Sequence, residues 1–495
     1  LPEGRVKAVT ARVNITMAED ERFFVNGYQT WTYCTEQGRH GFTRGMGKLP
    51  KFVIDKFGID RYGDYFFVDY PQTPGVMHGE SYCYFRRGGN YRLIASLDER
   101  AGYTLLRYDS RCGVLTISRD CAGVRCGGVF PALELYYAEG GEDAVFDGWF
   151  AAMGVKSRGA KRLCGYSSWY NRYQNIDAES ITGDLAGCAE HMLRGDLFQI
   201  DDGWEPAVGD WLETDAKKFP DGLKGTVRDI HGRGFLAGLW LAPFVCQKDS
   251  KIFREHPDWL LLHDGKPWYC GSNWGGFYAL DIDNAEFVRY LEQTFSLVLD
   301  DWGFDLVKLD FLYAAAPFGD ARESRAGRMT RALELLRRLC GDKLILGCGV
   351  PLMPSFGLVD YCRISCDVGL DWDNSLIMRH TNRERVSTRQ AIGNSISRRQ
   401  LNGRAFGNDP DVFFLRESNI RLSETDKYKL AVVNSLFGTL FLTSDNMGEY
   451  GSEAAALYER LRTLSERAEN IRVDTDNGLT VYYDLEGTEQ VLEIE

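Results

Sequence analysis

The chain has 495 residues, of which 44% are hydrophobic and 13% aromatic, and its 58 Lys and Arg against 71 Asp and Glu give a net charge of −13. This length allows two or three domains with a large apolar core, and the composition excludes an intrinsically disordered chain. The acidic balance, without a dense run of basic residues, argues against nucleic acid or an anionic membrane as a partner.

The chain shows no sign of membrane insertion, export or metal binding. No apolar run approaches the roughly 20 residues needed to cross a bilayer, and the first residues lack the pattern of a signal peptide, so we expect a cytoplasmic protein. Its 13 Cys include no C-x-x-C pair, which predicts reduced core thiols rather than disulfides or a zinc ribbon. Its seven His include none spaced for zinc, and we expect neither a metal nor an organic cofactor.

Residues 1–145 predict an N-terminal β-sandwich. The segment consists of short alternating runs rich in aromatic and β-branched residues, separated by Gly, Asp and Asn. The clearest of these runs are FFVNGYQTWTY, YFFVDY, YCYFRR, YRLIASL, GYTLLRYD, GVLTISRD and ALELYYAEG. A helical stretch, GEDAVFDGWFAAMGV, follows them.

Residues 146–445 predict a (β/α)8 barrel of the α/β class. Eight short apolar runs alternate there with helical patterns: LCGYSSWY, LFQIDDGW, FLAGLWLAP, DLVKLDFLY, KLILGCGV, YCRISCDVG, FGNDPDVFF and LFGTLFLTSD. Strands that alternate with helices form a parallel sheet, and eight such units close into a barrel. Residues 446–495 contain the short runs RVDT, TVYYDL and QVLEIE, which predict a small C-terminal β domain.

Two features of the third crossover are specific enough to test. One helix should bury a face formed by Phe287, Leu291, Phe295 and Val298, with Asp283 and Glu286 as a capping box at its start. The preceding segment, from Trp259 to Trp274, is longer than a crossover needs and rich in Trp and Gly, which indicates a loop over a site.

Four of the eight predicted strands end in carboxylates. The sequences concerned are Asp201-Asp202, Lys308-x-Asp310, Arg363-x-x-x-Asp367 and Asn408-Asp409-Pro410-Asp411. Because an unpaired buried charge costs several kcal/mol, these groups must pair with one another or face a polar cavity. A structural ion pair that closes the barrel is the alternative for any single pair, but four such ends favour a site at the C-terminal rim.

Aromatic residues near the same strand ends indicate a sugar as the ligand. They are Trp169, Tyr170, Trp204 and Trp240. Aromatic faces can stack on pyranose C–H groups while carboxylates accept hydrogen bonds from hydroxyls, although aromatic residues also pack protein cores.

Two carboxyl groups with separate roles are the usual means of cleaving a glycosidic bond. Lys308 should keep Asp310 ionised, as a nucleophile requires. Asp367 lies in a less charged local sequence, which suits an acid that must hold its proton, but Arg363 is four residues before it. The spacing leaves open whether the reaction retains or inverts the anomeric configuration.

At these residues the chain resembles the α-galactosidases of glycoside hydrolase family 36, in the clan of retaining α-galactosidases and α-N-acetylgalactosaminidases. The resemblance rests on motifs in the same order along nearly the whole chain: NGYQTW, GYSSWY, FQIDDGWEPAVGDW, LWLAPF, EHPDW, YALD, KLDFL, LGCG, RISCD and NDPD. It implies a β-sandwich, a (β/α)8 barrel and a C-terminal β domain, the architecture that the residue patterns predict.

The resemblance also implies a role for each site residue. Asp310 of K-x-D would be the nucleophile and Asp367 of R-I-x-x-D the acid/base. The substrate pocket would be formed by Asp201, Asp202, Lys308, Arg363, Trp240, Trp31, Tyr170, Cys348 and Cys366. Trp31 would reach the barrel mouth from the sandwich, with domain-interface packing as its alternative role.

The implied activity is that of a retaining exo-α-galactosidase, acting on an oligosaccharide or glycoconjugate without a cofactor. Ser365 and Cys366, near the sugar's 2-position, replace other small residues, so an α-N-acetylgalactosaminidase or α-galactosaminidase is the alternative. Two further hypotheses are a transglycosylase related to these enzymes and an inactive sugar-binding protein. A protein that only binds sugar would not need both an acid and a nucleophile. A homo-oligomer is possible.

Overall fold

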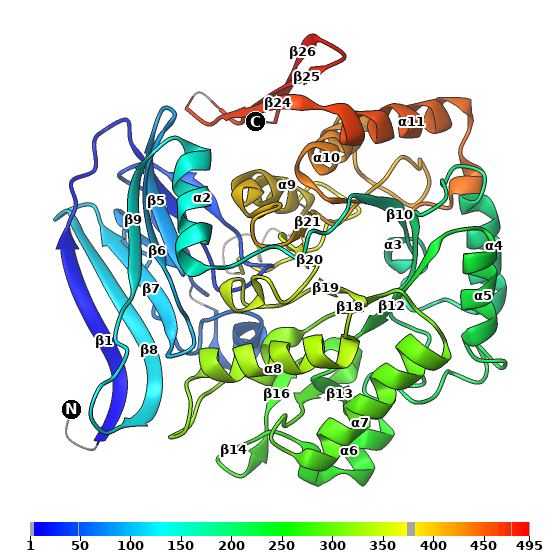
Figure 1. Ribbon diagram of the computed structural model, residues 1–495, viewed down its shortest axis with the longest axis horizontal. Helices are drawn as coiled ribbons and strands as arrows, with labels where there is room; N and C mark the ends of the chain where they lie inside the picture. Colours follow the sequence, from blue (N-terminus) through cyan, green and yellow to red (C-terminus); the bar gives the residue numbers. More distant parts are fainter. Residues whose placement is uncertain (1–3, 48, 374–381, 477, 495) are drawn as a thin grey trace.

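The computed structural model describes residues 4–47, 49–373, 382–476 and 478–494 (Figure 1). An antiparallel β domain lies beside a parallel barrel, and a small antiparallel sheet follows at the C-terminal end. The thirteen cysteines are unpaired, and all but Cys112 are buried. Among the described residues, no helix combines the length and apolar character needed to cross a membrane, and no cluster of His, Cys, Asp and Glu could hold a metal ion.

The N-terminal domain is a sandwich of two layers, as predicted. Its nine strands are β1 (Gly4–Asn14), β2 (Arg22–Val25), β3 (Thr35–Gln37), β4 (Val76–Glu80), β5 (Tyr82–Arg87), β6 (Asn90–Ser96), β7 (Tyr103–Asp109), β8 (Val114–Cys126) and β9 (Leu135–Gly140). One layer has the order β1-β8-β7-β4 and the other β3-β2-β5-β6-β9. The layers join at the tight corner between β4 and β5, where Ser81 has a positive φ of 61°.

The second layer of the sandwich is buried on both faces. Phe85 and Cys83 of β5 point into the core between the layers, while Tyr82 and Tyr84 point to the opposite face. There helix α2 (Glu142–Met153) covers the sheet, with the ring of Trp149 centred 5.1 Å from that of Tyr82. The second layer is therefore covered by the first layer on one face and by helix α2 on the other.

Eight parallel strand positions form the barrel, and each coincides with one of the eight predicted runs. The strands are β10 (Leu163–Ser167), β11 (Leu197–Ile200), β12 (Leu236–Leu241), β18 (Leu306–Leu309), β19 (Leu344–Gly347), β20 (Tyr361–Arg363), β21 (Gly407–Asp409) with β22 (Val412–Phe413), and β23 (Leu440–Thr443). The seventh position is split at Pro410, so that β21 pairs with β20 and β22 pairs with β23. This split strand completes the circuit of the sheet and confirms the predicted barrel class.

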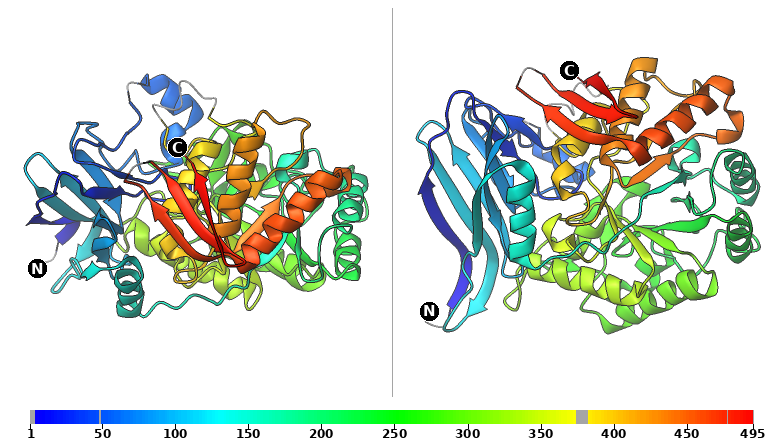
Figure 2. Two further views of the ribbon diagram at one scale, coloured as in Figure 1. Left: turned by 90° about the horizontal axis from the view of Figure 1, so that it is seen from above. Right: turned by 45° about the horizontal axis from the view of Figure 1, so that its top comes forward.

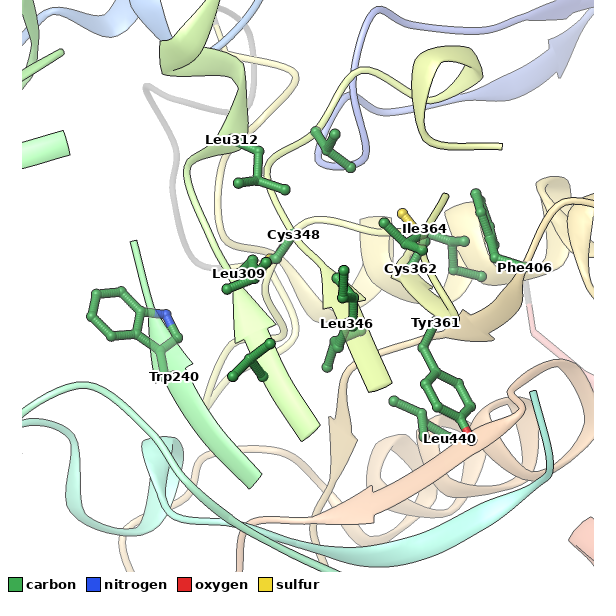
Figure 3. Packing of buried hydrophobic residues seen from close by; sticks show 14 of the residues in the cluster. Trp240, Leu309, Leu312, Leu346, Cys348, Tyr361, Cys362, Ile364, Phe406 and Leu440 are labelled. Atoms are coloured by element: carbon green, nitrogen blue, oxygen red, sulfur yellow. The ribbon is translucent and has the colours of Figure 1, made fainter. Parts of the chain in front are cut away.

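Apolar side chains fill the space within and around these strands. Figure 3 shows Leu309, Leu346 and Leu440 from different strands in this packing, with Trp240 at the end of β12. The polar rim described below therefore lies on a tightly packed support.

The helices around the barrel follow the chain order, with one exception. Those described are α3 (Trp169–Arg172), α4 (Ala178–Cys188), α5 (Lys224–Gly232), α6 (Lys251–Glu255), α7 (Ala285–Phe295), α8 (Arg325–Cys340), α9 (Thr388–Ser397), α10 (Glu424–Phe437) and α11 (Ser452–Arg467). The crossover from β19 to β20 has a short 3-10 turn, η6 (Met353–Ser355), in place of a long helix. Helix α2 packs there instead, with Trp149 and Phe150 at 6.0 and 5.3 Å from Phe356.

Helix α7 buries the predicted face but begins differently. Phe287, Leu291, Phe295 and Val298 are all buried, and the last of them lies in a π-helical turn (Ser296–Asp301). The N-cap is Asn284, whose side chain accepts hydrogen bonds from the backbone N–H groups of Glu286 and Phe287. The predicted capping box at Asp283 is wrong, because that carboxylate instead pairs with Arg328 at 2.6 Å.

The long third crossover folds into short strands and turns. It contains β13 (Val245–Gln247), β14 (Leu262–His263), β15 (Lys266–Pro267), β16 (Tyr269–Gly271) and β17 (Phe277–Ala279). β13, β17 and β16 form a small antiparallel sheet, and a 3-10 turn at Asn273–Gly275 lies between β16 and β17. The turn carries Trp274, which reaches the site described below.

The C-terminal sheet connects the barrel to the sandwich (Figure 2). Its strands are β24 (Glu469–Asp474), β25 (Thr480–Leu485) and β26 (Thr488–Glu493). Beyond β24, Thr475 donates a hydrogen bond of 2.7 Å to Glu36, and Asp476 pairs with Arg86 at 3.0 Å. The divisions at residues 145 and 445 stay predictions.

Candidate active site

A cavity of about 600 Å³ lies at the C-terminal rim of the barrel. Side chains from several strand ends, from the sandwich and from the chain after β20 surround it: Trp31, Tyr62, Trp169, Gln174, Asp201, Asp202, Trp240, Asn273, Trp274, Lys308, Asp310, Phe311, Asp367, Asn382, Glu384, Arg385 and Val386. Asp310 and Asp367, which are far apart in the sequence, therefore face a single space.

The floor of this cavity contains a buried ion pair between two strand ends. Lys308 Nζ lies 2.8 Å from Asp201 Oδ2, and both side chains are at most 8% exposed. Burial alone would lower the pKa of Lys308, but the charges of Asp201 and Asp310 outweigh it and raise that pKa above its ordinary value. The ammonium is therefore charged at neutral pH, and it has hydrogens left to donate to a ligand.

Asp310 is oriented by two N–H donors. Its Oδ2 accepts a hydrogen bond of 3.1 Å from Trp240 Nε1, and its Oδ1 accepts one of 2.8 Å from the backbone N–H of Phe311. Phe311 has a left-handed backbone with φ of 53°, which is costly for a bulky residue and turns the chain sharply after β18. The carboxylate is thus held in place at the cavity wall.

Two side-chain N–H donors hold one oxygen of Asp202. Gln174 Nε2 and Trp274 Nε1 each donate to Oδ2 at 2.9 Å. The other oxygen, Oδ1, is buried and has no hydrogen-bond partner among the described residues. Burial, with the neighbouring charge of Asp201, raises the pKa of Asp202. The buried carboxyl group of Glu205, whose pKa is raised by burial and by the charge of Asp202, also interacts with the Asp202 side chain.

Asp367 has an environment that favours its protonated form. Its side chain is 40% exposed, and Arg363 Nη1 lies 2.8 Å from Oδ1. Desolvation by the surrounding protein raises the pKa of Asp367, and the negative charge of Asp310 raises it further. The positive charges of Arg363 and Lys308 lower it. A raised pKa is the direction that a proton-donating carboxyl group requires.

Arg363 is shared by three carboxylates. Besides Asp367, its guanidinium pairs with Asp409 at 3.0 Å and with Asp411 at 2.9 Å, and the last two side chains are 2% exposed. Tyr170 Oη donates a hydrogen bond of 2.7 Å to Asp411. Burial raises the pKa of Asp411 to about 6, against the opposing effect of Arg363 and with the support of the Asp367 charge.

A buried arginine ties the sandwich to the barrel at this rim. Arg398, which is fully buried, donates to the backbone carbonyls of Gln29 and Thr32 in the sandwich at 3.2 and 3.0 Å. The same guanidinium donates to the carbonyl of Ile364, just after β20, at 2.8 Å. The loop around Trp31 is therefore anchored to the strand that leads to Asp367.

Trp31 lies over the residue that follows Asp310. Its ring meets the ring of Phe311 edge to face, with centroids 5.2 Å apart, and it lines the cavity. Domain-interface packing and a position at the cavity mouth are thus both true of this residue.

Seven predicted site residues line the cavity and four lie behind it. Those at the cavity are Trp31, Asp201, Asp202, Trp240, Lys308, Asp310 and Asp367. Arg363 and Tyr170 form the network behind Asp367. Cys348 and Cys366 are buried thiols; burial and the nearby Asp310 raise the pKa of Cys348, and Cys366 Sγ contacts the carbonyl of Ser387 at 3.6 Å.

Several lining residues were not singled out from the sequence. Trp274 lies in the loop that was predicted to cover a site, so composition gave part of that signal. Tyr62 comes from an insertion between β3 and β4, and Asn382, Glu384, Arg385 and Val386 come from the chain before α9. Neither segment has a motif or a periodicity that points to a barrel mouth.

A parallel barrel whose rim combines two carboxyl groups in different environments with aromatic faces is typical of the glycoside hydrolase class of site. Comparisons with known proteins agree. The Melibiase family model matches residues 160–332. An α-galactosidase from Escherichia coli is 32% identical over 182 residues, which cover 34% of this chain and 25% of that protein. An "A type blood alpha-D-galactosamine galactosaminidase" from Flavonifractor plautii is 32% identical over 128 residues, covering 23% of this chain and 11% of that protein.

A solved structure matches nearly the whole chain. The α-galactosidase TtGalA from Thermus thermophilus, in complex with p-nitrophenyl α-D-galactopyranoside, is 27% identical, with a TM-score of 0.79 over 98% of this chain and 92% of that one. The chain thus resembles the α-galactosidases of glycoside hydrolase family 36 over nearly its whole length. It spans about a quarter of the E. coli relative's length.

The buried pair of Lys308 and Asp201 gives the first testable prediction. Lys308→Met leaves a buried carboxylate without its cation and should lower the free energy of unfolding by about 3–5 kcal/mol. Adding Asp201→Asn should recover a substantial part of this loss, because the charge that lost its partner is then removed. Urea unfolding followed by circular dichroism measures both.

The exposed pair of Lys251 with Glu213 provides a matched control. Lys251→Met should leave the unfolding transition unchanged, since such surface pairs contribute little. Strict additivity of the Lys308 and Asp201 substitutions would contradict the proposed dependence of one charge on the other.

Proposed function

We propose that the chain is a retaining exo-α-galactosidase that releases terminal α-linked galactose from oligosaccharides or glycoconjugates by double displacement. The observation that carries the proposal is the placement of Asp310 and Asp367 on one cavity in different environments. Similarity to α-galactosidases and the ligand named with TtGalA support galactose as the sugar.

In the first step, an oxygen of Asp310 attacks the anomeric carbon while the bond to the leaving oxygen breaks. Asp367 transfers its proton to that leaving oxygen, which departs as an alcohol. The raised pKa of Asp367 supports this role, because an acid must be protonated when substrate arrives. The product is a covalent galactosyl ester of Asp310.

In the second step, Asp367 acts as a base. Its carboxylate takes a proton from water as the water oxygen attacks the anomeric carbon and the ester bond to Asp310 breaks. Galactose leaves with its original configuration, and both carboxyl groups return to their starting protonation states. Two displacements at one carbon account for retention.

The remaining polar groups would recognise the sugar hydroxyls. The Asp202 side chain lines the cavity, and Lys308 has donor hydrogens beyond the one given to Asp201. Trp240 and Trp274 contribute aromatic faces to the same wall. The hydroxyl groups of a bound galactose would form hydrogen bonds with the polar side chains, while its C–H groups pack on the aromatic faces.

An α-N-acetylgalactosaminidase or α-galactosaminidase is the second candidate. The similarity to the F. plautii galactosaminidase favours it, as do the small residues Ser365 and Cys366 before the acid. Both side chains are fully buried behind the cavity, so their effect would be exerted through the shape of the wall. A cytoplasmic location and a homo-oligomer stay predictions.

A panel of aryl α-glycosides tests the proposed function. Purified protein should release the aryl group from the α-galactoside at a kcat/KM at least about tenfold above that for its 2-acetamido and 2-amino analogues. NMR of the first sugar formed should show the α-anomer, as retention requires. A reversed preference would establish the second candidate, and a β-anomer as first product would overturn the double displacement.

Asp367 gives a prediction that depends on the leaving group. Asp367→Ala should reduce kcat/KM by at least about 100-fold on an alkyl or sugar α-galactoside, whose departing oxygen needs a proton. The loss should be far smaller on an activated aryl galactoside or on galactosyl fluoride, because the departing aryloxide or fluoride ion needs no proton. Steady-state kinetics on the series measures the ratio, and equal losses on all substrates would contradict the acid role.

A further inference from the structure

The break in the seventh strand places two carboxylates, Asp409 and Asp411, in contact with Arg363, the same arginine that pairs with Asp367. β21 ends at Asp409, and β22 begins after Asp411, which has a φ of 76°. Such a backbone is uncommon for a residue with a side chain and has to be maintained by its surroundings. Here the backbone N–H of Asp411 donates to Asp409 Oδ1 at 3.0 Å, and Asn434 donates to the carbonyl of Asp411 at 3.0 Å.

The charges around Arg363 do not balance. One guanidinium contacts three carboxylates, at 2.8 Å for Asp367, 3.0 Å for Asp409 and 2.9 Å for Asp411. A structural ion pair would need one acid for this one base. The two extra carboxylates are buried, so solvent screens their charges little, and the charges of Asp411 and Asp367 act on each other.

Asp411 also holds the backbone beside Asp367. Its Oδ2 accepts a hydrogen bond of 2.9 Å from the backbone N–H of Val368, the residue directly after Asp367, and one of 2.7 Å from Tyr170. Its Oδ1 lies 2.9 Å from Arg363 Nη2. One carboxylate therefore fixes both the chain that carries Asp367 and the cation that contacts it.

We propose that Asp411, with Asp409, is a positioning residue for Asp367: by competing for Arg363, the two carboxylates keep that guanidinium from stabilising the Asp367 carboxylate fully, so that Asp367 can hold the proton it must donate. The inference rests on the proposed role of Asp367 as acid/base. Asp411 itself touches no substrate in this account, since its side chain lies behind the cavity wall.

Other ionisable groups lie near Asp367 and Asp411 and contribute to the electrostatic potential at these two carboxyl groups. Besides Arg363 and Asp409, they are Lys308, Asp310, Tyr170, Tyr173, Cys348 and Cys366. Arg385 also acts on Cys366, but its guanidinium is paired with Asp373 at 2.9 Å. Asp411 differs from these groups because it contacts both Arg363 and the backbone N–H of Val368, the residue after Asp367.

The pH profile of the Asp411→Asn variant tests the proposal. The alkaline limb of kcat/KM reports loss of the proton from Asp367 in the free protein. Removing a neighbouring negative charge favours the ionised form, so the limb should move to lower pH by about one unit. Wild type and variant should converge below about pH 6, where Asp411 becomes protonated and no longer repels.

Two further variants make the result decisive. Asp409→Asn removes the other competitor and should move the limb in the same direction; it carries the test if Asp411→Asn does not fold. Asp360→Asn is the matched control, since Asp360 is a buried carboxylate paired with Arg158 and Arg337 at the opposite end of β20. It should leave the position of the limb unchanged, even if stability falls.

The outcomes separate this inference from the proposed function. An active wild-type protein whose alkaline limb stays in place in Asp411→Asn and Asp409→Asn, with an equal loss at every pH, would show a merely structural role and overturn the inference alone. A limb that moves to higher pH would also overturn it. A wild-type protein without α-galactoside or α-galactosaminide hydrolysis would overturn the proposed function and this inference together.

Discussion

The charged groups at the barrel rim can be buried only because they form pairs across strand ends. Lys308 pairs with Asp201, and Arg363 pairs with Asp367, Asp409 and Asp411. The carboxyl ends of parallel strands meet at one edge of a sheet, so residues distant in sequence come within reach of one another there. The cavity and the different environments of Asp310 and Asp367 depend on this arrangement.

The sandwich and the crossovers complete what the barrel alone leaves open. Helix α2 packs where the crossover from β19 to β20 has no long helix, and Arg398 fixes the Trp31 loop to the chain after β20. Trp31 and Trp274 then line the cavity, and both rings contact the ring of Phe311. The accessory elements thus shape the site as well as stabilise the fold.

Much of this organisation could be predicted from the sequence, because it depends on local patterns. Runs of apolar residues between helical segments located all eight barrel strands, and charged residues at four strand ends indicated the site. The predicted N-cap of α7 was wrong because the adjacent residues Asp283 and Asn284 are both good N-cap residues. The arginines that pair with Asp283 belong to α8, which is distant in the sequence.

Other parts of the site depend on distances that a sequence does not contain. Asp409 and Asp411 were recognised as charged strand-end residues, but their sharing of Arg363 requires β20 and β21 to be neighbours. Tyr62 and four residues before α9 (Asn382, Glu384, Arg385 and Val386) reach the cavity from loops, whose paths are set by tertiary contacts.

The most direct test of the account is to trap the covalent intermediate. The protein would be incubated with a fluorinated galactosyl donor that forms a slowly hydrolysed glycosyl ester, digested, and analysed by peptide mass spectrometry. The account predicts one galactosyl-type adduct, on the side chain of Asp310, and none in the Asp310→Asn variant. An adduct on Asp367 or another residue, or rapid turnover through a product of inverted configuration, would contradict it.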